Sequence, residues 1–263
     1  MPKYTLAVST LDDGILNYRL PDIHRIDDIS ILIIHQISNN KKDFDYSISY
    51  SKLKEKKETI EIIKSDQLGL SKSRNLAINN SKTPYIIFSD DDNSYSSDLI
   101  DILDRITSRF KLQIYSFRIV TQDGEPFKLY PDTEIKHNNR SILRLSSIEN
   151  VYDLDFIKKN KILFNEDFGL GSKYPSCEQP IFAKDILDNK GEGCFFPIDI
   201  AIHPKENSGD NYYQPIQAQT RKKMFLNIYG KKGWVFIFAF YLKKLKSVPL
   251  KSQLPFFYGL FIK

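Results

Sequence analysis

Short apolar runs alternate with segments of helical periodicity along the first half of the chain. The runs that predict strands cover 4–9, 29–35, 85–88 and 112–119. The second is rich in isoleucine, which is β-branched and favours strands. Helices are predicted over 71–80, with Ser71 as the N-cap, and over 98–110. Alternating strands and helices predict an α/β domain with a mainly parallel sheet.

The segments on either side of the 71–80 helix are less regular. Further strands are predicted over 44–50 and 59–63, with the lysine-rich stretch 52–57 as a solvated turn or helix face between them. Beyond residue 120 we expect a loop at 164–171, a helix at 178–189 and a strand at 195–203. No internal repeat or low-complexity linker separates these segments. The expected organisation is one catalytic domain over 1–220 and a tail over 221–263.

Charge and cysteine content limit the partners and the compartment. The formal net charge is +5, with the excess mostly near the C-terminus, which suits an anionic substrate or membrane surface. No zinc-finger spacing, aromatic RNA-binding signature or long basic arm is present, so nucleic acid is not an expected partner. Two cysteines, Cys177 and Cys194, are too few for a disulfide scaffold. Without a signal-peptide pattern or a run of about 20 apolar residues, we expect a cytoplasmic protein.

The strand at 85–88 runs into three consecutive aspartates, Asp90, Asp91 and Asp92. Adjacent carboxylates repel one another unless solvent or a cation compensates. Mg²⁺ or Mn²⁺ accepts such oxygens and bridges to phosphates, so it would stabilise a diphosphate leaving group. Ligands of parallel α/β sheets bind beyond the carboxyl ends of the strands, where these aspartates lie. The alternative is a solvated acidic turn that caps the next helix.

The order of the next motifs is more specific than the aspartates alone. The segment 69–78, Gly-Leu-Ser-Lys-Ser-Arg-Asn-Leu-Ala-Ile, precedes 83–92, which ends in the aspartates. This pair resembles the central signature of family-two glycosyltransferases with the GT-A fold, over roughly the first 210 residues of the chain. The resemblance implies a Rossmann-like GT-A domain with a mostly parallel sheet flanked by helices. It implies that Asp90 contacts the ribose or base side of a nucleotide-sugar, that Asp91 fills the variable middle position, and that Asp92 binds the metal.

Two further residues of this signature are candidates for the nucleotide-sugar site. Arg74 offers a planar, permanently charged donor fork for phosphate or carboxylate. Its alternative role is structural, pairing with the aspartates to order their loop. Gly69 permits a tight turn into the helix.

Residues 165–179 resemble the family's Gly-rich acceptor loop and the acidic pair that follows it. In inverting members a carboxylate of that pair deprotonates the acceptor hydroxyl, which is a poor nucleophile at neutral pH. The second position here is Gln179, which cannot act as a base, so Glu178 is the candidate. Glu166 and Asp167 remain alternatives, and Glu178 would also favour the helix N-terminus through its charge alone.

Other positions follow from the resemblance. The family's usual Pro-x-Tyr-Asn is missing after the first strand, and the variant found there resembles a subset of bacterial polysaccharide transferases. On that basis Thr10 and Asp13 are candidates for contact with the nucleotide. Asp66 matches a position that often faces the uracil or ribose. His203 follows the strand at 195–203 and matches a histidine that completes the metal shell or touches the diphosphate; the alternative is a structural histidine.

From Arg221 onward the chain is basic and aromatic. Two apolar runs, 234–242 and 254–262, are each too short to span a bilayer, and Lys243, Lys244 and Lys246 lie between them. This pattern suits a helical element at an anionic membrane surface. The alternative is packing against the catalytic domain or a second subunit.

Together these features predict a metal-dependent, inverting glycosyltransferase that uses Mn²⁺ or Mg²⁺ and a nucleotide-sugar, with a UDP-sugar favoured. The expected acceptor is a hydroxyl of a growing surface polysaccharide, as in capsule or lipopolysaccharide biosynthesis, carried on a lipid at the inner face of the plasma membrane. A nucleotidyl-type α/β enzyme is one alternative, although 11–14 is acidic where such enzymes carry a basic Gly-rich loop. A degenerate, non-catalytic sugar-nucleotide-binding module is the other.

Overall fold

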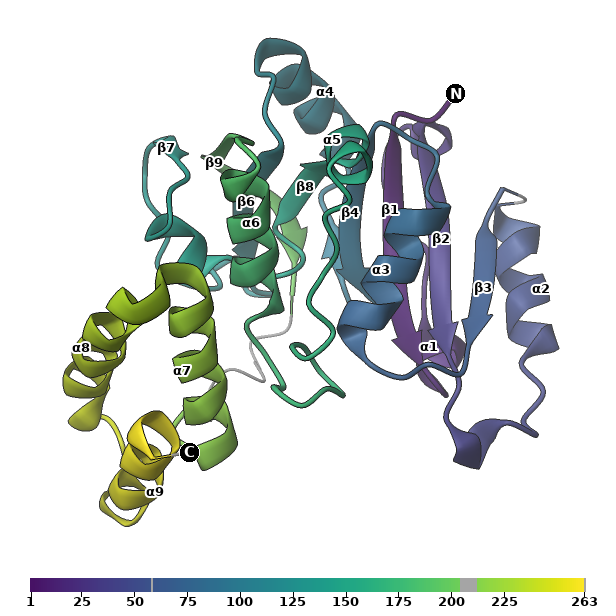
Figure 1. Cartoon of the computed structure of the whole chain (residues 1–263). Helices are drawn as coiled ribbons and strands as arrows, with labels where there is room; N and C mark the ends of the chain where they lie inside the picture. The colour runs from purple at the N-terminus through teal and green to yellow at the C-terminus, as the bar shows by residue number, and fades with distance from the viewer. Residues whose placement is uncertain (58, 204–211, 263) are drawn as a thin grey trace.

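A computed structural model describes residues 1–57, 59–203 and 212–262 (Figure 1). The strands are β1 (Tyr4–Leu11), β2 (Ile29–Gln36), β3 (Glu61–Ser65), β4 (Tyr85–Asp90), β5 (Ser94–Tyr95), β6 (Ile114–Val120), β7 (Ile135–Lys136), β8 (Asn150–Asp153) and β9 (Gly193–Ile202). The α-helices are α1 (Gly14–Asn17), α2 (Ser47–Lys56), α3 (Leu70–Asn80), α4 (Leu99–Arg109), α5 (Leu154–Lys159), α6 (Glu178–Asp188), α7 (Pro215–Tyr229), α8 (Gly233–Leu245) and α9 (Leu250–Phe261). Short 3₁₀ turns are η1 (Ile26–Asp28), η2 (Asn39–Lys41), η3 (Ser141–Arg144) and η4 (Gly230–Lys232).

The described strands form one sheet in the order β3-β2-β1-β4-β8-β6-β9-β5, with β7 paired to β9. The strands β3, β2, β1 and β4 are parallel neighbours, and β6 is parallel to β9. Only β8 interrupts the parallel core, since it runs antiparallel to both β4 and β6. The prediction of a mainly parallel α/β sheet is confirmed. The register places Ser9 of β1 beside Asp90 of β4, so the ends of these strands meet at one edge.

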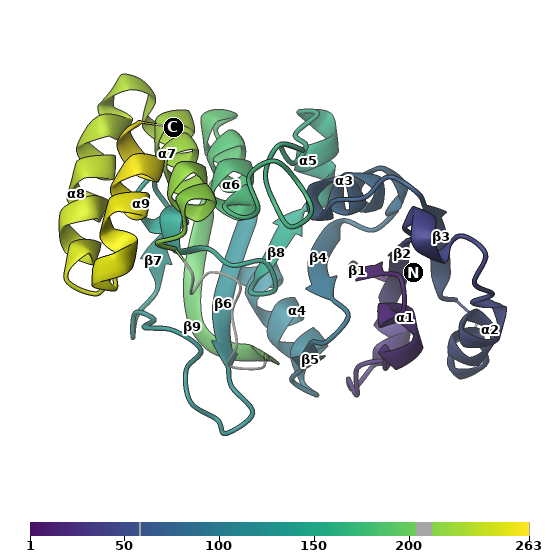
Figure 2. The same cartoon turned by 90° about the horizontal axis from the view of Figure 1, so that it is seen from below.

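Helices cover both faces of the sheet, which is why its central strands are apolar along their whole length. Figure 2 shows α3, α5 and α6 on one face, with α4 and α1 on the other. Phe88 and Phe182 are in the core beneath the first set of helices. Leu103 of α4 and Ile15 of α1 belong to the core on the opposite face. The two packed layers hold the strand ends, and the loops that follow them, in fixed positions.

The strand predicted over 44–50 is wrong, because this segment begins the helix α2. Asp45 accepts hydrogen bonds from the amide of Ser47, at 2.9 Å, and from its hydroxyl, at 3.0 Å, as the helix begins. Tyr46, Tyr50 and Leu53 recur at helical spacing and pack against the core. Lys52, Lys54 and Lys56 are exposed on α2, in keeping with the predicted solvated helix face. Lys57, just after the helix, differs from the prediction, because it is buried and donates to the carbonyl of Ile26 at 2.9 Å.

The predicted N-cap of α3 is also wrong. Gly69 occupies the cap position with φ +124°, and the helix begins at Leu70. Ser71 lies one residue inside the helix, where its hydroxyl is buried and donates to the carbonyl of Phe168 at 2.6 Å. The Ser71 side chain therefore ties α3 to the loop at 164–171.

The C-terminal residues form three helices that pack on one another and on the preceding part of the chain, at the end of the molecule opposite β3 (Figures 1 and 2). Their shared core includes Phe225 of α7, Ile237 of α8 and Phe256 of α9, and it extends to Phe168 and Ile181 of the preceding domain. The helix α7 runs without interruption across the boundary expected at 220/221. Among the described residues, no helix is both long and apolar enough to cross a membrane.

Candidate active site

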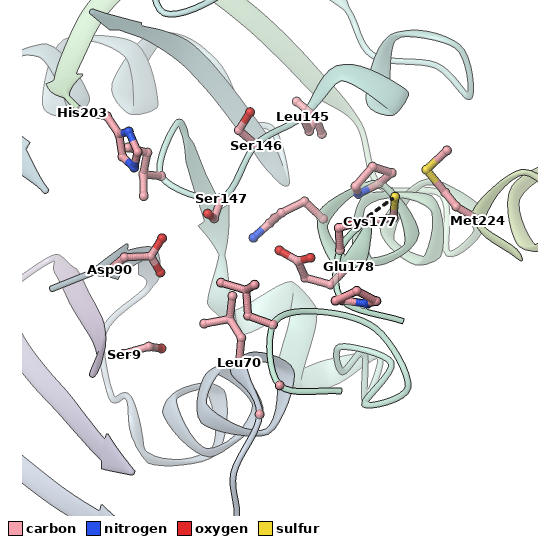
Figure 3. Close-up of a pocket in the computed structure, with 18 of the residues that line it drawn as sticks. Ser9, Leu70, Asp90, Leu145, Ser146, Ser147, Cys177, Glu178, His203 and Met224 are labelled. Carbon is pink, nitrogen blue, oxygen red and sulfur yellow. Dashed lines mark hydrogen bonds between the residues drawn. The ribbon is translucent and has the colours of Figure 1, made fainter. Parts of the chain in front are cut away.

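A cavity of about 1250 Å³ opens at the carboxyl ends of β1 and β4. Its walls come from the loop after β4, the segment after η3, the start of α6, and the helices α7 and α8. Candidate residues from distant parts of the sequence line it: Thr10, Asp90, Asp91, Asp92, Glu178 and His203. The side chains of Asp90 and Glu178 point toward each other across the cavity, with His203 on a third side (Figure 3).

The acidic side of the cavity begins where β4 ends. Burial raises the pKa of Asp90; the Arg74 guanidinium opposes this effect, while the charges of Asp92, Glu178 and Asp91 add to it. Asp91 accepts a hydrogen bond from the Thr10 hydroxyl at 2.5 Å, which joins the ends of β1 and β4. Asp92 is exposed to solvent. The cavity therefore concentrates negative charge that an added cation would relieve.

Gly14 makes room for this arrangement. A Cβ placed on Gly14 would lie 2.1 Å from Asp91 Oδ2 and 2.7 Å from the Thr10 hydroxyl. A larger residue here would displace the Asp91 carboxylate, so the residue at position 14, in the first turn of α1, must be small.

Arg74 links the two sides of the cavity from beneath. Its side chain is fully buried, with Nη1 donating to Glu178 Oε1 at 2.8 Å and Nη2 3.6 Å from Asp90 Oδ1. The rings of Phe164 and Phe88 lie 5.5 Å and 5.9 Å from the guanidinium carbon. The structure shows Arg74 paired with two carboxylates, and its contact with a nucleotide-sugar stays a prediction.

Glu178 is the first residue of α6, where the helix N-terminus favours a negative charge. Its side chain is 12% exposed, and Arg74 contacts only Oε1 of the carboxylate. Gln179 is buried, and its side-chain oxygen accepts from the Tyr152 hydroxyl at 2.7 Å. Glu178 therefore presents its carboxylate to the cavity, whereas the side-chain amide of Gln179 is hydrogen-bonded within the core.

The alternative bases lie elsewhere. Glu166 accepts from Asn75 at 3.1 Å and lines a separate cavity of about 570 Å³, together with Asp66 and Lys72. Asp167 is exposed, and its carbonyl accepts from the amide of Tyr174 at 2.8 Å. Neither acidic side chain lines the cavity that contains Asp90 and Glu178.

The loop at 164–171 is joined to the start of α3 through glycines. The amide of Leu70 donates to the carbonyl of Leu170 at 2.9 Å. A Cβ on Gly171, whose φ is +75°, would lie 3.3 Å from Gly69 Cα. This close approach holds the loop at 164–171 against the helix that carries Arg74, and Gly69 has the tight-turn conformation expected of it.

The remaining predicted residues are distributed unevenly. The Asp13 carboxylate pairs with Lys41 at 2.6 Å and accepts from the Tyr46 hydroxyl at 3.0 Å. Both Asp13 and Asp66 lie outside the lining of the main cavity. His203 does line it, and its ring meets that of Phe127 edge-on at 5.1 Å. Within the described part of the chain, no three His, Cys, Asp or Glu side chains are grouped as a preformed metal site.

Basic residues that were not predicted also line this cavity. Arg144 of η3, Arg221 of α7 and the lysines Lys243 and Lys244 of α8 all line it. For Arg221, Lys243 and Lys244 the available signal was the basic character of the tail, which does not reveal that α7 and α8 pack beside the cavity.

Known proteins share the family and the fold of this chain. The family described as Glycosyl transferase family 2 matches residues 32–168, just over half of the 263 residues. The fold is similar to S. aureus TarS 1-349 in complex with UDP-GlcNAc, with TM-score 0.66 and 14% identity over 98% of this chain and 79% of that one. It is also similar to the mannosyltransferase PcManGT from Pyrobaculum calidifontis in complex with GDP-Man and Mn²⁺, with TM-score 0.56 and 11% identity over 96% and 78%. No curated protein matches the sequence. The chain therefore belongs to glycosyl transferase family 2, and it is a sugar-transferring enzyme with the GT-A fold.

Proposed function

We propose that this enzyme transfers a sugar from a nucleotide-sugar, with a UDP-sugar favoured, to an acceptor hydroxyl with inversion at the anomeric carbon. One observation carries the proposal: Glu178 and the aspartates after β4 face the same cavity, and Arg74 holds Glu178 beside Asp90. A base and a diphosphate-binding cluster must share one space if a hydroxyl is to attack as the diphosphate leaves.

Glu178 is the proposed general base. The hydrogen bond from Arg74 Nη1 to Oε1, at 2.8 Å, holds the Glu178 carboxylate in position at the cavity. Because Arg74 bonds to Oε1 alone, Oε2 is left for the acceptor hydroxyl. Removal of that proton makes the oxygen a competent nucleophile. Attack from the Glu178 side, opposite the leaving group, would invert the anomeric centre.

The donor is proposed to bind at the acidic side, with Thr10, Gly69, Asp90 and Asp91 around the nucleotide-sugar. The carboxylates fit a hard divalent ion, since they are crowded and the pKa of Asp90 is raised. Asp92 and His203 are the residues that would hold Mn²⁺ or Mg²⁺. When bound, the ion would neutralise the departing diphosphate. The nucleotide-sugars in the complexes of TarS and PcManGT, and the Mn²⁺ in the second, support this assignment.

The sequence also suggested Asp13 and Asp66 as nucleotide contacts. Asp13 is proposed to act indirectly, because its ion pair with Lys41 and hydrogen bond with Tyr46 fix the turn beside Thr10. Gln36 lines the main cavity, and Asp66 lines the separate one. Asp66 is proposed to contact the base of a nucleotide that extends past Gln36 toward the separate cavity.

The acceptor is proposed to be a growing surface polysaccharide on a lipid carrier, of the capsule or lipopolysaccharide type, at the inner face of the plasma membrane. The exposed side of α8 supports a membrane contact, since Trp234, Val235, Phe238 and Leu242 are 44–70% exposed. Lys246 and Lys251 lie close by in the sequence and suit anionic headgroups.

A donor panel tests the function. UDP-, GDP- and dTDP-sugars with Mn²⁺ would be scored for nucleotide release by the wild type, Asp92→Asn and Asp132→Asn. Asp132 is an exposed aspartate outside the cavity and controls for the loss of charge. We expect release from one donor that is lost in Asp92→Asn and kept in Asp132→Asn. No release and no nucleotide binding by calorimetry would contradict the proposal and favour a non-catalytic module.

A further inference from the structure

The active-site cavity has opposite charges at its two ends. Asp90 and Ser9 lie on one side of Glu178, and Cys177 and Met224 lie on the other (Figure 3). The second side is where the C-terminal helices form the wall, with Arg221 of α7 and the neighbouring lysines Lys243 and Lys244 of α8. The acceptor hydroxyl must approach Glu178, so a basic wall beyond Glu178 faces the acceptor.

Arg221 and Lys244 are held in place by neighbouring side chains. Arg221 donates to the side-chain oxygen of Gln217 at 3.2 Å, and the same oxygen accepts from Ser176, two residues before Glu178, at 2.8 Å. Lys244 Nζ lies 4.4 Å from the centre of the Tyr212 ring. Burial lowers the pKa of Arg221, so an anion beside it would be favourable. Across the described ranges, neither Lys243 nor Lys244 makes an ion pair with a carboxylate.

A second cavity continues from this end. It has a volume of about 940 Å³ and lies between α7, α8 and the segment leading into η3. Both cavities are lined by Leu143, Phe225, Phe240 and Lys243, so these residues mark the junction between them. No Asp or Glu occurs among the described residues that line the second cavity, whereas several walls are aromatic. An acceptor that extends from Glu178 toward the second cavity would pass Lys243, which lines both.

We propose that Lys243 and Lys244, together with Arg221, form an acceptor subsite that binds a phosphate group of the acceptor. The inference rests on the proposed function and adds the chemical class of its second substrate. Two ammonium groups and a guanidinium match the charge and the several oxygens of a phosphate. The phosphate belongs either to a lipid carrier or to a water-soluble phosphodiester polymer, and the two sources share this chemistry.

The test measures phosphate binding while the donor site is filled with saturating UDP, or with the nucleotide that the donor panel identifies. The probes are sn-glycerol 3-phosphate and dodecyl phosphate below its micelle concentration. Lys243→Gln/Lys244→Gln is compared with Lys52→Gln/Lys54→Gln, which removes the same charge from exposed lysines of α2 outside both cavities. Lys243→Gln alone is a second variant, because Lys243 is exposed and Lys244 contacts Tyr212.

We expect the Kd of both probes to rise at least tenfold in the first pair, about threefold or more in Lys243→Gln, and less than twofold in the control pair. Tighter binding of dodecyl phosphate than of glycerol phosphate assigns the phosphate to a lipid carrier with its chain in the second cavity. Equal affinities assign it to a soluble phosphodiester. Equal effects of the two lysine pairs, or no binding by the wild type, would overturn the subsite.

The proposed function is judged separately, by nucleotide release from the wild-type enzyme. If the wild type releases nucleotide but binds no phosphate probe, the subsite is wrong and the transferase assignment stands. If it neither releases nor binds nucleotide, the function proposed above fails, whatever the probes show.

Discussion

Arg74 forms ion pairs with two carboxylates that are 88 positions apart in the chain (178 − 90): Nη1 is 2.8 Å from Glu178 Oε1 and Nη2 is 3.6 Å from Asp90 Oδ1. One side of this arrangement belongs to the proposed acceptor base and the other to the proposed donor site. The guanidinium therefore fixes the distance between the proposed base and the proposed donor site. Arg74 does not itself line the cavity.

Arg74→Ala is expected to destabilise the fold by about 3–5 kcal/mol, because it leaves two partly buried carboxylates without their cation. Arg74→Lys should cost less, since it keeps the charge but loses the fork. Urea unfolding measures both. Arg118→Ala, which breaks a more exposed pair with Asp199, is the control and should cost about 1 kcal/mol or less. A loss that small for Arg74→Ala would show that the carboxylates do not depend on it.

Glu178→Gln should lower kcat by about 10²- to 10⁴-fold while the Kd for the donor stays within a few-fold. The amide oxygen can still accept from Arg74, so the fold is preserved while the base is lost. Transfer kinetics and calorimetry separate the two effects. Glu166→Gln, outside the cavity, should behave as the wild type. Turnover retained by Glu178→Gln would remove this residue from the mechanism.

His203→Ala should raise the Mn²⁺ concentration that gives half-maximal activity by about tenfold, if His203 helps to hold the ion. A titration of activity against Mn²⁺ measures this change. His24→Ala is the matched control, because His24 lies on the surface beside Asp98. A titration identical to that of the wild type would assign His203 a structural role against Phe127.

The exposed face of α8 predicts membrane binding. Val235→Ser/Phe238→Ser should lower binding to vesicles of 3:1 phosphatidylcholine and phosphatidylglycerol by about tenfold, because both side chains lose buried apolar area. Co-sedimentation measures it, with Leu129→Ser as a control for an exposed leucine elsewhere. Unchanged vesicle binding together with a smaller particle in solution would instead identify this face as a contact between subunits.

His137 predicts a loss of stability in mild acid. Burial lowers its pKa to about 4, and its ring is hydrogen-bonded between Ser116 and Ser141. Between about pH 6.5, the ordinary pKa of histidine, and pH 4, His137 is protonated in the unfolded chain but not in the folded protein. The free energy of unfolding therefore falls from pH 6.5 toward 4, by at most about 3 kcal/mol. The difference between the urea midpoints at pH 7 and pH 4.5 should be smaller in His137→Gln than in the wild type. Identical pH slopes would contradict this account.

Local signals in the sequence were enough for part of this site. The strand that ends at Asp90 and the helix that carries Arg74 are continuous motifs, and their spacing predicted both elements. The placement of Glu178 opposite them followed from the family resemblance. The helix α2 was missed because the tyrosines at its start favour strands. The rings of Tyr46 and Tyr50, which are four residues apart as on one face of a helix, both contact His35.

Long-range packing decided what the sequence left open. Whether Arg74 meets a phosphate or a carboxylate depends on the aromatic rings of Phe88 and Phe164, which bury it. The four residues of β8 are too few for a reliable alternation pattern, although they join the two halves of the sheet. Lys243 and Lys244 line the cavity because α8 packs on α7 at that end of the molecule, an arrangement that no local pattern encodes.

The close approach of Gly69 and Gly171 limits how this enzyme can acquire a new specificity. Gly69 and Gly171 both have positive φ, and any side chain at 171 would press on Gly69. Libraries that randomise only the segment around Gly69, or only the one around Gly171, will therefore yield mostly misfolded variants. Leu170 lies between these constraints with its side chain 51% exposed at the cavity, while its carbonyl holds the amide of Leu70. Backbone contacts at 170 survive a change of side chain. Directed evolution of acceptor choice should therefore start at this single position, with its glycine neighbours left intact.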